Sequence, residues 1–377
     1  MSHTFLAPSS AATWSVCSLS PTMRARFPQE HGSSEADEGT AAHWVAWELV
    51  MGHDVALHAQ APNGLLVTEE MLEGAELVAD TLITRRTVQK DLVIEMTILI
   101  ASIHADMWGT PDLWYFDFQH CRLEIFDYKF GHRFVDEFWN KQGLCYLSGI
   151  VDVICQKYGW TYGQLEPVMT VAFTVIQPRC FYRGSSVRTH EFKLSECRPR
   201  FNHLANMAEA ATIHTPTATV NEHCGDCPGR HACDTLQLSA YTAAEYSSRR
   251  GIVELTPSAA ALELKILSAA LDRLTARVEG LKEVTIANLT AGKHVPYYRA
   301  EPGMGRSTWN IPAPQVIAIG SLSGINLQKP AEVVTPTQAK KLGVDERIVA
   351  QFSFTPKTAT RLIPETQTDA ARIFGRS

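Results

Sequence analysis

A chain of 377 residues can bury a sizeable core, and its length fits either one large domain with an appendage or two domains. The formal net charge of -6 excludes an overall positive field, so any nucleic acid would be met by local basic patches or through a bound metal ion. Residues 1–20 lack a cationic start and a long apolar core, and no apolar run approaches the roughly 18 residues of a membrane span. We therefore expect a soluble protein in the cytoplasm of a bacterium or a phage-infected host cell, with no membrane partner.

The first predicted elements are two helices, a strand and a hairpin. Residues 38–51 follow Asp37 as an N-cap and end at Gly52, which predicts a helix. Residues 69–86 carry apolar side chains at helical spacing, and residues 92–98 form an apolar run typical of a strand. Residues 107–130 predict a β-hairpin, because two apolar and aromatic runs flank the turn-like residues 117–120.

Helices and strands then alternate along the chain. Helices are expected over residues 140–157 and 195–212, and strands over residues 168–176 and 187–194. This order predicts an α/β fold with a mixed central sheet flanked by helices.

The C-terminal part differs in pattern. Thr256 and Pro257 signal the start of a long helix over about residues 257–289. Its leucine and valine side chains recur at alternating spacings of three and four, at positions 264, 267, 271, 274, 278 and 281. Such a seam serves either packing on its own domain or dimerisation, so a homo-oligomer is an open alternative. We expect residues 1–240 to form one domain, and residues 241–377 to form an extension with this helix and a small α+β tail.

Two aspartates and a lysine form the first constellation with chemical meaning. Asp112 follows a Gly-Thr-Pro turn at the start of one hairpin strand, and Asp127 and Lys129 end the other. Strand pairing would bring the aspartates to a shared Mg²⁺ or Mn²⁺, ions that prefer oxygen ligands. Lys129 would position a water molecule or stabilise negative charge, as phosphodiester hydrolysis requires. The alternative is that both aspartates are turn residues and Lys129 is their ion-pair partner.

The wider pattern resembles the PD-(D/E)XK nuclease superfamily, through G-T-P-D at 109–112 and D-Y-K at 127–129. E-G-T-A-A-H at 38–43 and Q-G-L-C-Y at 142–146 extend the resemblance to its RecB-like branch. The resemblance implies a restriction-endonuclease-like core. It also implies a set of catalytic residues, namely His43, Asp112, Asp127, Lys129, Gln142 and Tyr146.

Within that set, the resemblance implies that His43 and the two aspartates bind the metal ion. Gln142 and Tyr146, one helical turn apart, would contact DNA or the lysine. Other polar residues beside the motifs have simpler alternatives. Glu38 and Glu95 fit exposed or capping roles better than metal ligation, and His132 and Arg133 would either meet phosphates or form a surface charge pair.

A short loop rich in cysteine follows residue 220. The nine cysteines of the chain are odd in number and unevenly spread, unlike the disulfide framework of a small secreted protein. Cys224, Cys227 and Cys233 form a C-x2-C-x5-C pattern, which favours a soft metal. Zinc could take His223 or His231 as a fourth ligand, whereas an iron-sulfur cube more often takes a fourth cysteine.

The order of the motifs is similar to that in iron-sulfur nucleases of the AddB type, in CRISPR-adaptation nucleases, and in a family of phage and prophage proteins. These nucleases have one cysteine before the catalytic motifs and three after them, and Cys17 occupies the early position here. The resemblance implies a [4Fe-4S] cluster, with zinc as the lesser alternative, that staples the N-terminal segment to the far end of the nuclease domain. Its ligands would be Cys17, Cys224, Cys227 and Cys233.

These features predict a metal-dependent DNA nuclease, an exonuclease or DNA-end-processing enzyme of phage recombination, replication or DNA repair. The chain contains no G-x-x-x-x-G-K-[ST] segment, so an ATP-driven helicase would be a partner in trans, as would a recombinase or a single-strand-binding protein. One alternative is a catalytically inactive nuclease-like protein that binds DNA or recombination partners. Another is a zinc-stapled nucleic-acid-binding module.

Overall fold

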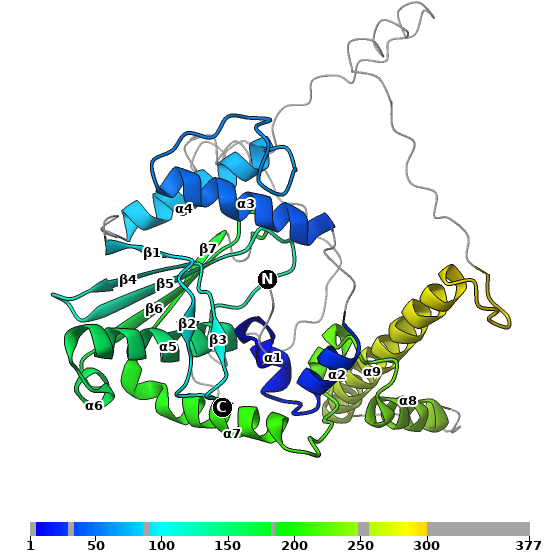
Figure 1. Ribbon diagram of the computed structural model, residues 1–377. Coiled ribbons are helices and arrows are strands. Elements are labelled where there is room, and N and C mark those ends of the chain that lie inside the picture. Colours follow the sequence, from blue (N-terminus) through cyan, green and yellow to red (C-terminus); the bar gives the residue numbers. More distant parts are fainter. Residues whose placement is uncertain (1–4, 29–33, 86–90, 182–184, 248–255, 300–377) are drawn as a thin grey trace, which may run out of the picture. The chain divides into compact units, whose positions relative to one another are not determined.

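A computed structural model describes residues 5–28, 34–85, 91–181, 185–247 and 256–299 (Figure 1). The chain divides into two compact units, Met1–Tyr298 and Arg299–Ser377, and every element below belongs to the first. The small α+β tail expected after the long helix falls outside the described residues. The first unit is a mixed α/β structure, as the sequence predicts.

A five-stranded mixed sheet forms its centre, with the strand order β1-β4-β5-β6-β7. The strands are β1 (Val93–Ile94), β4 (Leu113–Asp117), β5 (Arg122–Tyr128), β6 (Thr170–Ile176) and β7 (Val187–Lys193). β5 and β6 are parallel, whereas the other neighbouring pairs are antiparallel. A parallel pair needs a crossover connection, which contains helix α5 (Lys141–Tyr158).

The hairpin of β4 and β5 confirms the predicted one. Asp117 closes its turn, because the carboxylate accepts hydrogen bonds from the backbone N–H groups of Gln119 and His120. The single strand predicted over residues 92–98 is wrong. Glu95 has a φ of 45°, a left-handed conformation that separates β1 from β2 (Ile98–Leu99). β2 pairs instead with β3 (Trp108–Gly109) in a two-stranded ribbon.

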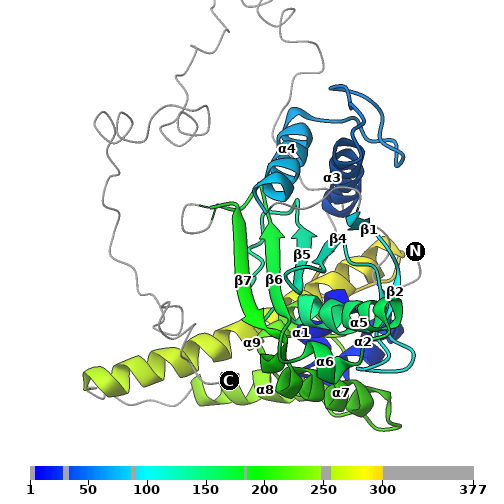
Figure 2. The same cartoon turned by 90° about the vertical axis from the view of Figure 1, so that its left-hand side faces the viewer.

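Helices cover both faces of the sheet (Figure 1, Figure 2). α3 (Ser34–Val50) and α4 (Glu69–Thr84) lie on one face, and α5 and α7 (Arg198–Thr212) lie on the other. Alternation along β5 divides its side chains between two cores. Phe126 and Tyr128 pack with α3 and α4, whereas Leu123 and Ile125 pack with α5. Asp127 continues the face of Leu123 and Ile125, at the end of the strand.

Local sequence sets several helix ends. The side chains of Thr68, Asn140 and Thr256 accept hydrogen bonds from first-turn N–H groups of α4, α5 and α9 (Pro257–Thr290), respectively. The predicted long helix is therefore confirmed. The predicted N-cap Asp37 is wrong, because α3 already begins at Ser34 and Asp37 lies in its first turn, where the helix dipole favours a carboxylate.

Several shorter helices flank the cysteine loop. α1 (Ala11–Trp14) and α2 (Ser20–Arg26) precede it in sequence, and α8 (Asp234–Ser247) follows it. α9 packs against α8 and against this loop. Elsewhere in the chain, the short helix α6 (Tyr162–Leu165) follows α5. Most seam residues of α9 remain exposed, among them Leu264, Leu267 and Leu271. The described helices include none with the length and apolar content needed to cross a membrane.

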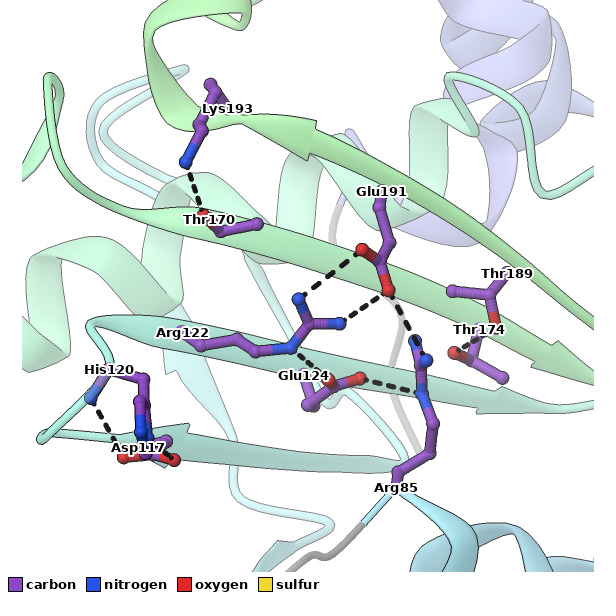
Figure 3. Close-up of polar contacts among 10 residues, drawn as sticks. All are labelled: Arg85, Asp117, His120, Arg122, Glu124, Thr170, Thr174, Thr189, Glu191 and Lys193. Atoms are coloured by element: carbon purple, nitrogen blue, oxygen red, sulfur yellow. Dashed lines mark hydrogen bonds and ion pairs between the residues drawn. The ribbon is translucent and has the colours of Figure 1, made fainter.

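An ion-pair network lies on the α4 side of the sheet (Figure 3). Glu124 of β5 is buried, and its carboxylate lies 2.6 Å from Arg122 Nε and 3.2 Å from Arg85 Nε. Glu191 of β7 contacts the same two guanidinium groups, at 2.6 Å and 3.3 Å. Two arginines therefore neutralise two glutamates, and the network ties Arg85 at the end of α4 to two strands.

Candidate active site

Three of the predicted site residues meet at the carboxyl end of β5. Asp112 directly precedes β4, and Asp127 lies near the end of β5. Leu113 pairs with Phe126, so the antiparallel register sets Asp112 opposite Asp127. Lys129 follows the strand, and its Nζ atom lies 3.0 Å from Asp127 Oδ1. The hairpin thus brings both aspartates and the lysine together.

The two aspartates lie in a poorly hydrated setting. The side chain of Asp127 is 3% exposed, and that of Asp112 is 16% exposed. Burial raises the pKa of Asp112 to about 6, although Lys129 and the N–H of Tyr128, which donates to Asp112 Oδ2 at 2.8 Å, act in the opposite direction. Burial also raises the pKa of Asp127, against the charge of Lys129. Among the described residues, no group donates a hydrogen bond to Asp127 Oδ2.

Lys129 is the cation that faces these carboxylates. Burial by itself lowers its pKa, but Asp127 and then Asp112 outweigh burial and raise the pKa above its usual value. The side chain is therefore an ammonium group at neutral pH. In that state it can stabilise negative charge or hold a water molecule through its N–H donors, and it cannot serve as a general base.

His43 reaches the same place from α3. Its Nε2 atom lies 3.0 Å from the carbonyl oxygen of Tyr128, and because a carbonyl only accepts, Nε2 carries the hydrogen. Nδ1 then holds the lone pair and lies 3.9 Å from Asp112 Oδ1. Burial and the charge of Lys129 lower the pKa of His43 to about 4, so the ring is neutral at neutral pH. A neutral imidazole whose free nitrogen faces a carboxylate is the form that binds metal ions.

Helix α5 contributes the remaining predicted pair. Gln142 Nε2 donates to the hydroxyl of Tyr146 at 3.4 Å, so the two side chains lie on one helix face as their spacing predicts. Burial raises the pKa of Tyr146, and the charges of Asp112 and Asp127 raise it further, which puts the phenol beside the aspartates. Gly109 makes this approach feasible, because a Cβ atom there would lie 2.8 Å from Tyr146 Cε1.

Glu95 joins the acidic edge of the site, beyond the exposed or capping role expected for it. Its backbone N–H donates to the carbonyl oxygen of Asp112 at 2.9 Å, and its carboxylate accepts from Trp47 Nε1 at 2.7 Å. The charge of Glu95 adds to the raised pKa of Asp112. Glu95 is exposed, so it extends the negative charge towards solvent. In the sequence, Glu95 is the charged residue within the mostly apolar run over residues 92–98, and this contrast was the signal that could have marked it as a site residue.

Gln177 anchors the segment after Lys129 and was missed from the sequence. It is fully buried after β6, and its Nε2 atom donates to the carbonyl oxygens of Gly131 at 2.9 Å and Arg133 at 2.7 Å. Its Oε1 atom accepts from Arg188 at 2.8 Å. No local pattern reveals such a role, because the partners are backbone groups far away in the sequence.

Two other motif-neighbouring residues are engaged in ion pairs. Glu38 forms a bidentate pair with Arg179, at 2.6 Å and 2.7 Å. Arg133 forms the expected surface charge pair, with Asp226 at 2.6 Å and 2.9 Å, and thereby joins the segment after Lys129 to the cysteine loop. His132 is exposed.

The four predicted cysteine ligands line one small cavity beside α1 and α2. They are Cys17, Cys224, Cys227 and Cys233. Backbone N–H groups point at two of the sulfurs, from Thr219 to Cys17 at 3.5 Å and from Asn221 to Cys224 at 3.3 Å. Burial raises the pKa of Cys224 and of Cys227, and the nearby thiols raise both further. His223 also lines the cavity, whereas the ring of His231 packs against Phe27.

Comparison with protein families gives a match over nearly the whole chain. Residues 3–369 match the family described as a protein of unknown function, DUF2800. The chain belongs to the DUF2800 family. A comparison with curated proteins gave no match. The DUF2800 match includes both the carboxylate site and the cysteine loop, and its description names no activity.

Neither the carboxylate site nor the cysteine cavity of this DUF2800 protein has its described side chains in metal-binding positions. Within the described residues, no group of three or more His, Cys, Asp or Glu side chains already has the arrangement that would hold a metal ion. At the carboxylate site, Lys129 and the N–H of Tyr128 occupy one oxygen of each aspartate. The other oxygen of each aspartate, Asp112 Oδ1 and Asp127 Oδ2, is not engaged by these two groups.

Proposed function

We propose that this DUF2800 protein is a metal-dependent DNA nuclease with a RecB-like, restriction-endonuclease-like core of the PD-(D/E)XK superfamily. The observation that carries the proposal is the meeting of Asp112, Asp127, Lys129 and neutral His43 at one end of β5. Two buried carboxylates outnumber the single ammonium group there, and such an imbalance is typical of functional sites that bind a cation.

The topology supports the nuclease core. An antiparallel hairpin carries both aspartates, helix α5 follows, and β6 then runs parallel to β5. This arrangement places Gln142 and Tyr146 at the start of α5, beside the end of β5. Every motif that resembles the superfamily thus contributes a side chain at or next to the same strand end.

The donor set fits a hard divalent cation. His43, Asp112 and Asp127 would hold Mg²⁺ or Mn²⁺, because carboxylate oxygens suit these ions and a neutral imidazole is an accepted ligand. When bound, the ion would polarise the phosphate and lower the pKa of a bound water molecule. Lys129 would orient the attacking water or stabilise charge on the phosphate. Tyr146 and Gln142 would contact the DNA or support the lysine.

The cysteine cavity fits a thiolate-bound metal centre. We propose a [4Fe-4S] cluster held by four cysteines, with zinc as the lesser alternative. Four converging thiols suit the cluster, and the two N–H groups directed at sulfur are the kind of contact that stabilises bound thiolates. Because Cys17 is distant in sequence from the other three, the centre would close a long loop and stabilise the nuclease domain.

The proposed substrate is a DNA end, with the protein acting as an exonuclease or end-processing enzyme in phage recombination, replication or repair. A helicase, recombinase or single-strand-binding protein would act with it in trans. The second candidate is a catalytically inactive nuclease-like protein that grips DNA. The contact between Lys129 and Asp127 favours this second candidate, because the ammonium group already neutralises one of the carboxylates that would bind the metal ion.

Cleavage of end-labelled DNA tests the proposal. Anaerobically purified protein would be given linear or covalently closed DNA with Mg²⁺, Mn²⁺ or EDTA, beside the Asp127→Ala variant. We expect metal-dependent loss of linear DNA alone, and no loss with the variant. Intact DNA of both forms after incubation with cluster-loaded protein would reject the nuclease and leave the binding protein.

A further inference from the structure

A cleft of about 950 Å³ opens beside the candidate active site. Lys129 and Gln142 of the candidate site line it, and so do Gly225 and Asp226 of the cysteine loop. Its side walls come from the N-terminal segment, including Ser9, Ser10 and Arg24, and from residues 133–141. The cleft therefore connects the carboxylate site to the cysteine loop along the surface of the protein.

Cationic side chains gather in the lining of the cleft. Five cations and three carboxylates line it, and two of the cations, Lys129 and Arg230, contact carboxylates outside the lining, namely Asp127 and Glu283. The cations are Arg24, Lys129, Arg133, Lys141 and Arg230, and the carboxylates are Asp136, Glu222 and Asp226. Cations gathered in a cleft attract a negatively charged ligand.

Two of these cations have no tight partner among the residues that the structure describes. Arg133 pairs with Asp226, Arg230 with Glu283, and Lys129 with Asp127. Neither Arg24 nor Lys141 makes an ion pair or a side-chain hydrogen bond to another described residue, although Glu222 is close enough to Lys141 to interact through its charge. Arg24 and Lys141 are thus the two side chains placed to meet an anionic ligand.

Aromatic rings also line the wall formed by residues 133–141. Phe134 is 38% exposed, and the guanidinium of Arg188 lies 4.9 Å from the centre of its ring. Trp139 is held from behind by Arg200, at 3.4 Å from the ring centre. Gln177 and Arg188 fix the backbone of this wall through hydrogen bonds to Gly131, Arg133 and Val135. Of the two rings, Phe134 is exposed and Trp139 is half-buried. Cations beside an exposed aromatic ring on a fixed backbone are typical of a surface that binds single-stranded nucleic acid.

The cysteine loop presents two faces. Cys224 and Cys227 line the thiol cavity, while Gly225 and Asp226 line the cleft. Three side chains border both spaces, namely Thr13, His223 and Arg230. A change in the thiol cavity would therefore act on side chains that also line the cleft.

We propose that this cleft binds the single-stranded end of a nucleic acid, with its phosphates at Arg24 and Lys141 and its terminus at Lys129. The cysteine loop forms part of the cleft wall, so a centre in the thiol cavity shapes the strand-binding surface as well as stabilising the fold. The direction of the strand rests on the proposed nuclease function. The binding itself does not require cleavage.

Binding is measured on full-length Asp127→Asn protein, which keeps the size of the side chain and prevents cutting. Fluorescence anisotropy compares single-stranded DNA, single-stranded RNA and blunt duplex DNA of one length across a salt series. We expect a single strand to bind most tightly, with the DNA and RNA arms identifying the sugar. Lys141→Glu should weaken its binding about tenfold and flatten the salt dependence, because a phosphate contact is lost.

Lys157→Glu is the matched control, since Lys157 lies near the other end of α5 and the net charge change is the same. It should leave the affinity unchanged, while Arg24→Glu on α2 should repeat the loss seen at Lys141. Equal effects of Lys141→Glu and Lys157→Glu, or tighter binding of blunt duplex than of a single strand, would overturn the inference. Cleavage by the parent protein is scored separately, so a protein that binds without cutting refutes only the nuclease proposal.

Discussion

Strand β5 carries a charged cluster at each end, and the two clusters differ in balance. At its start, Glu124 and the neighbouring Glu191 each contact both Arg122 and Arg85, so positive and negative charges match. One buried carboxylate, Glu124, and one exposed carboxylate, Glu191, lie together there, with a guanidinium group for each. Such a network holds strands and a helix end in place.

At the other end of β5, Lys129 is the one cation among the described residues that forms an ion pair with the aspartate pair Asp112 and Asp127. Glu95 adds a further negative charge. Burial raises the pKa of both aspartates, and Asp127 Oδ2 accepts no hydrogen bond from the described residues. This cluster costs the folded state free energy. Such imbalances cluster at functional sites, so the comparison supports our proposal that one end of the strand serves stability and the other end serves chemistry.

Removing a carboxylate at the chemical end should have the largest effect. Asp127→Ala is expected to lower DNA cleavage by about a thousandfold or more, because a charge-stabilising group of the site is lost. The matched control is Glu124→Gln, also buried on β5, which should keep cleavage per folded molecule near that of the parent. Initial rates on labelled linear DNA give the readout. Equal losses of cleavage rate in the two variants would contradict the proposal that the two ends of β5 have different roles.

Cys227→Ser should lose bound metal and stability together, by several kcal/mol in the free energy of unfolding. The matched control is Cys155→Ser, because Cys155 lies on α5 outside the thiol cavity. This variant should retain the metal. Metal analysis, visible absorption and thermal melting give the three readouts. A Cys227→Ser protein that melts at the parent temperature would show that the loop needs no staple.

Glu124→Gln should lower the free energy of unfolding by about 3 kcal/mol, because Arg122 and Arg85 would lose a buried partner. Urea unfolding at equilibrium measures the change. Lys193→Ala is the control, because Lys193 lies on the same sheet face but outside the network. It should shift the midpoint of urea unfolding far less. An unchanged midpoint for Glu124→Gln would remove the network from the stability of the fold.

Asp112→Asn should stabilise the metal-free protein at neutral pH by roughly 1 to 2 kcal/mol. Burial raises the pKa of Asp112 from 3.8 to about 6, so its contribution to stability is fully present below pH 3.8 and is lost as the pH rises through about 6. Asparagine keeps the acceptor for the N–H of Tyr128 and removes the charge. The advantage of the variant should therefore vanish near pH 4, which denaturant unfolding in EDTA at several pH values can check.

The sequence was most informative where the controlling interactions are local. Side-chain alternation, turn residues and caps predicted the hairpin, helix α5 and the long helix α9, because each depends on contacts within a few residues. The start of α3 was missed, since Asp37 is also favourable inside a first turn. The run over residues 92–98 was read as one strand, because nothing in its apolar pattern reveals the left-handed conformation at Glu95.

For the candidate site, the sequence by itself determined the residue types and their order. The hairpin register then follows almost automatically, and it sets Asp112 opposite Asp127. Only the tertiary structure decided the rest: the tautomer and neutrality of His43, the unbalanced charge around Lys129, the anchoring by Gln177, and the cavity that gathers Cys17 with three distant cysteines. These features depend on burial and on partners far away in the chain, which a linear pattern does not record.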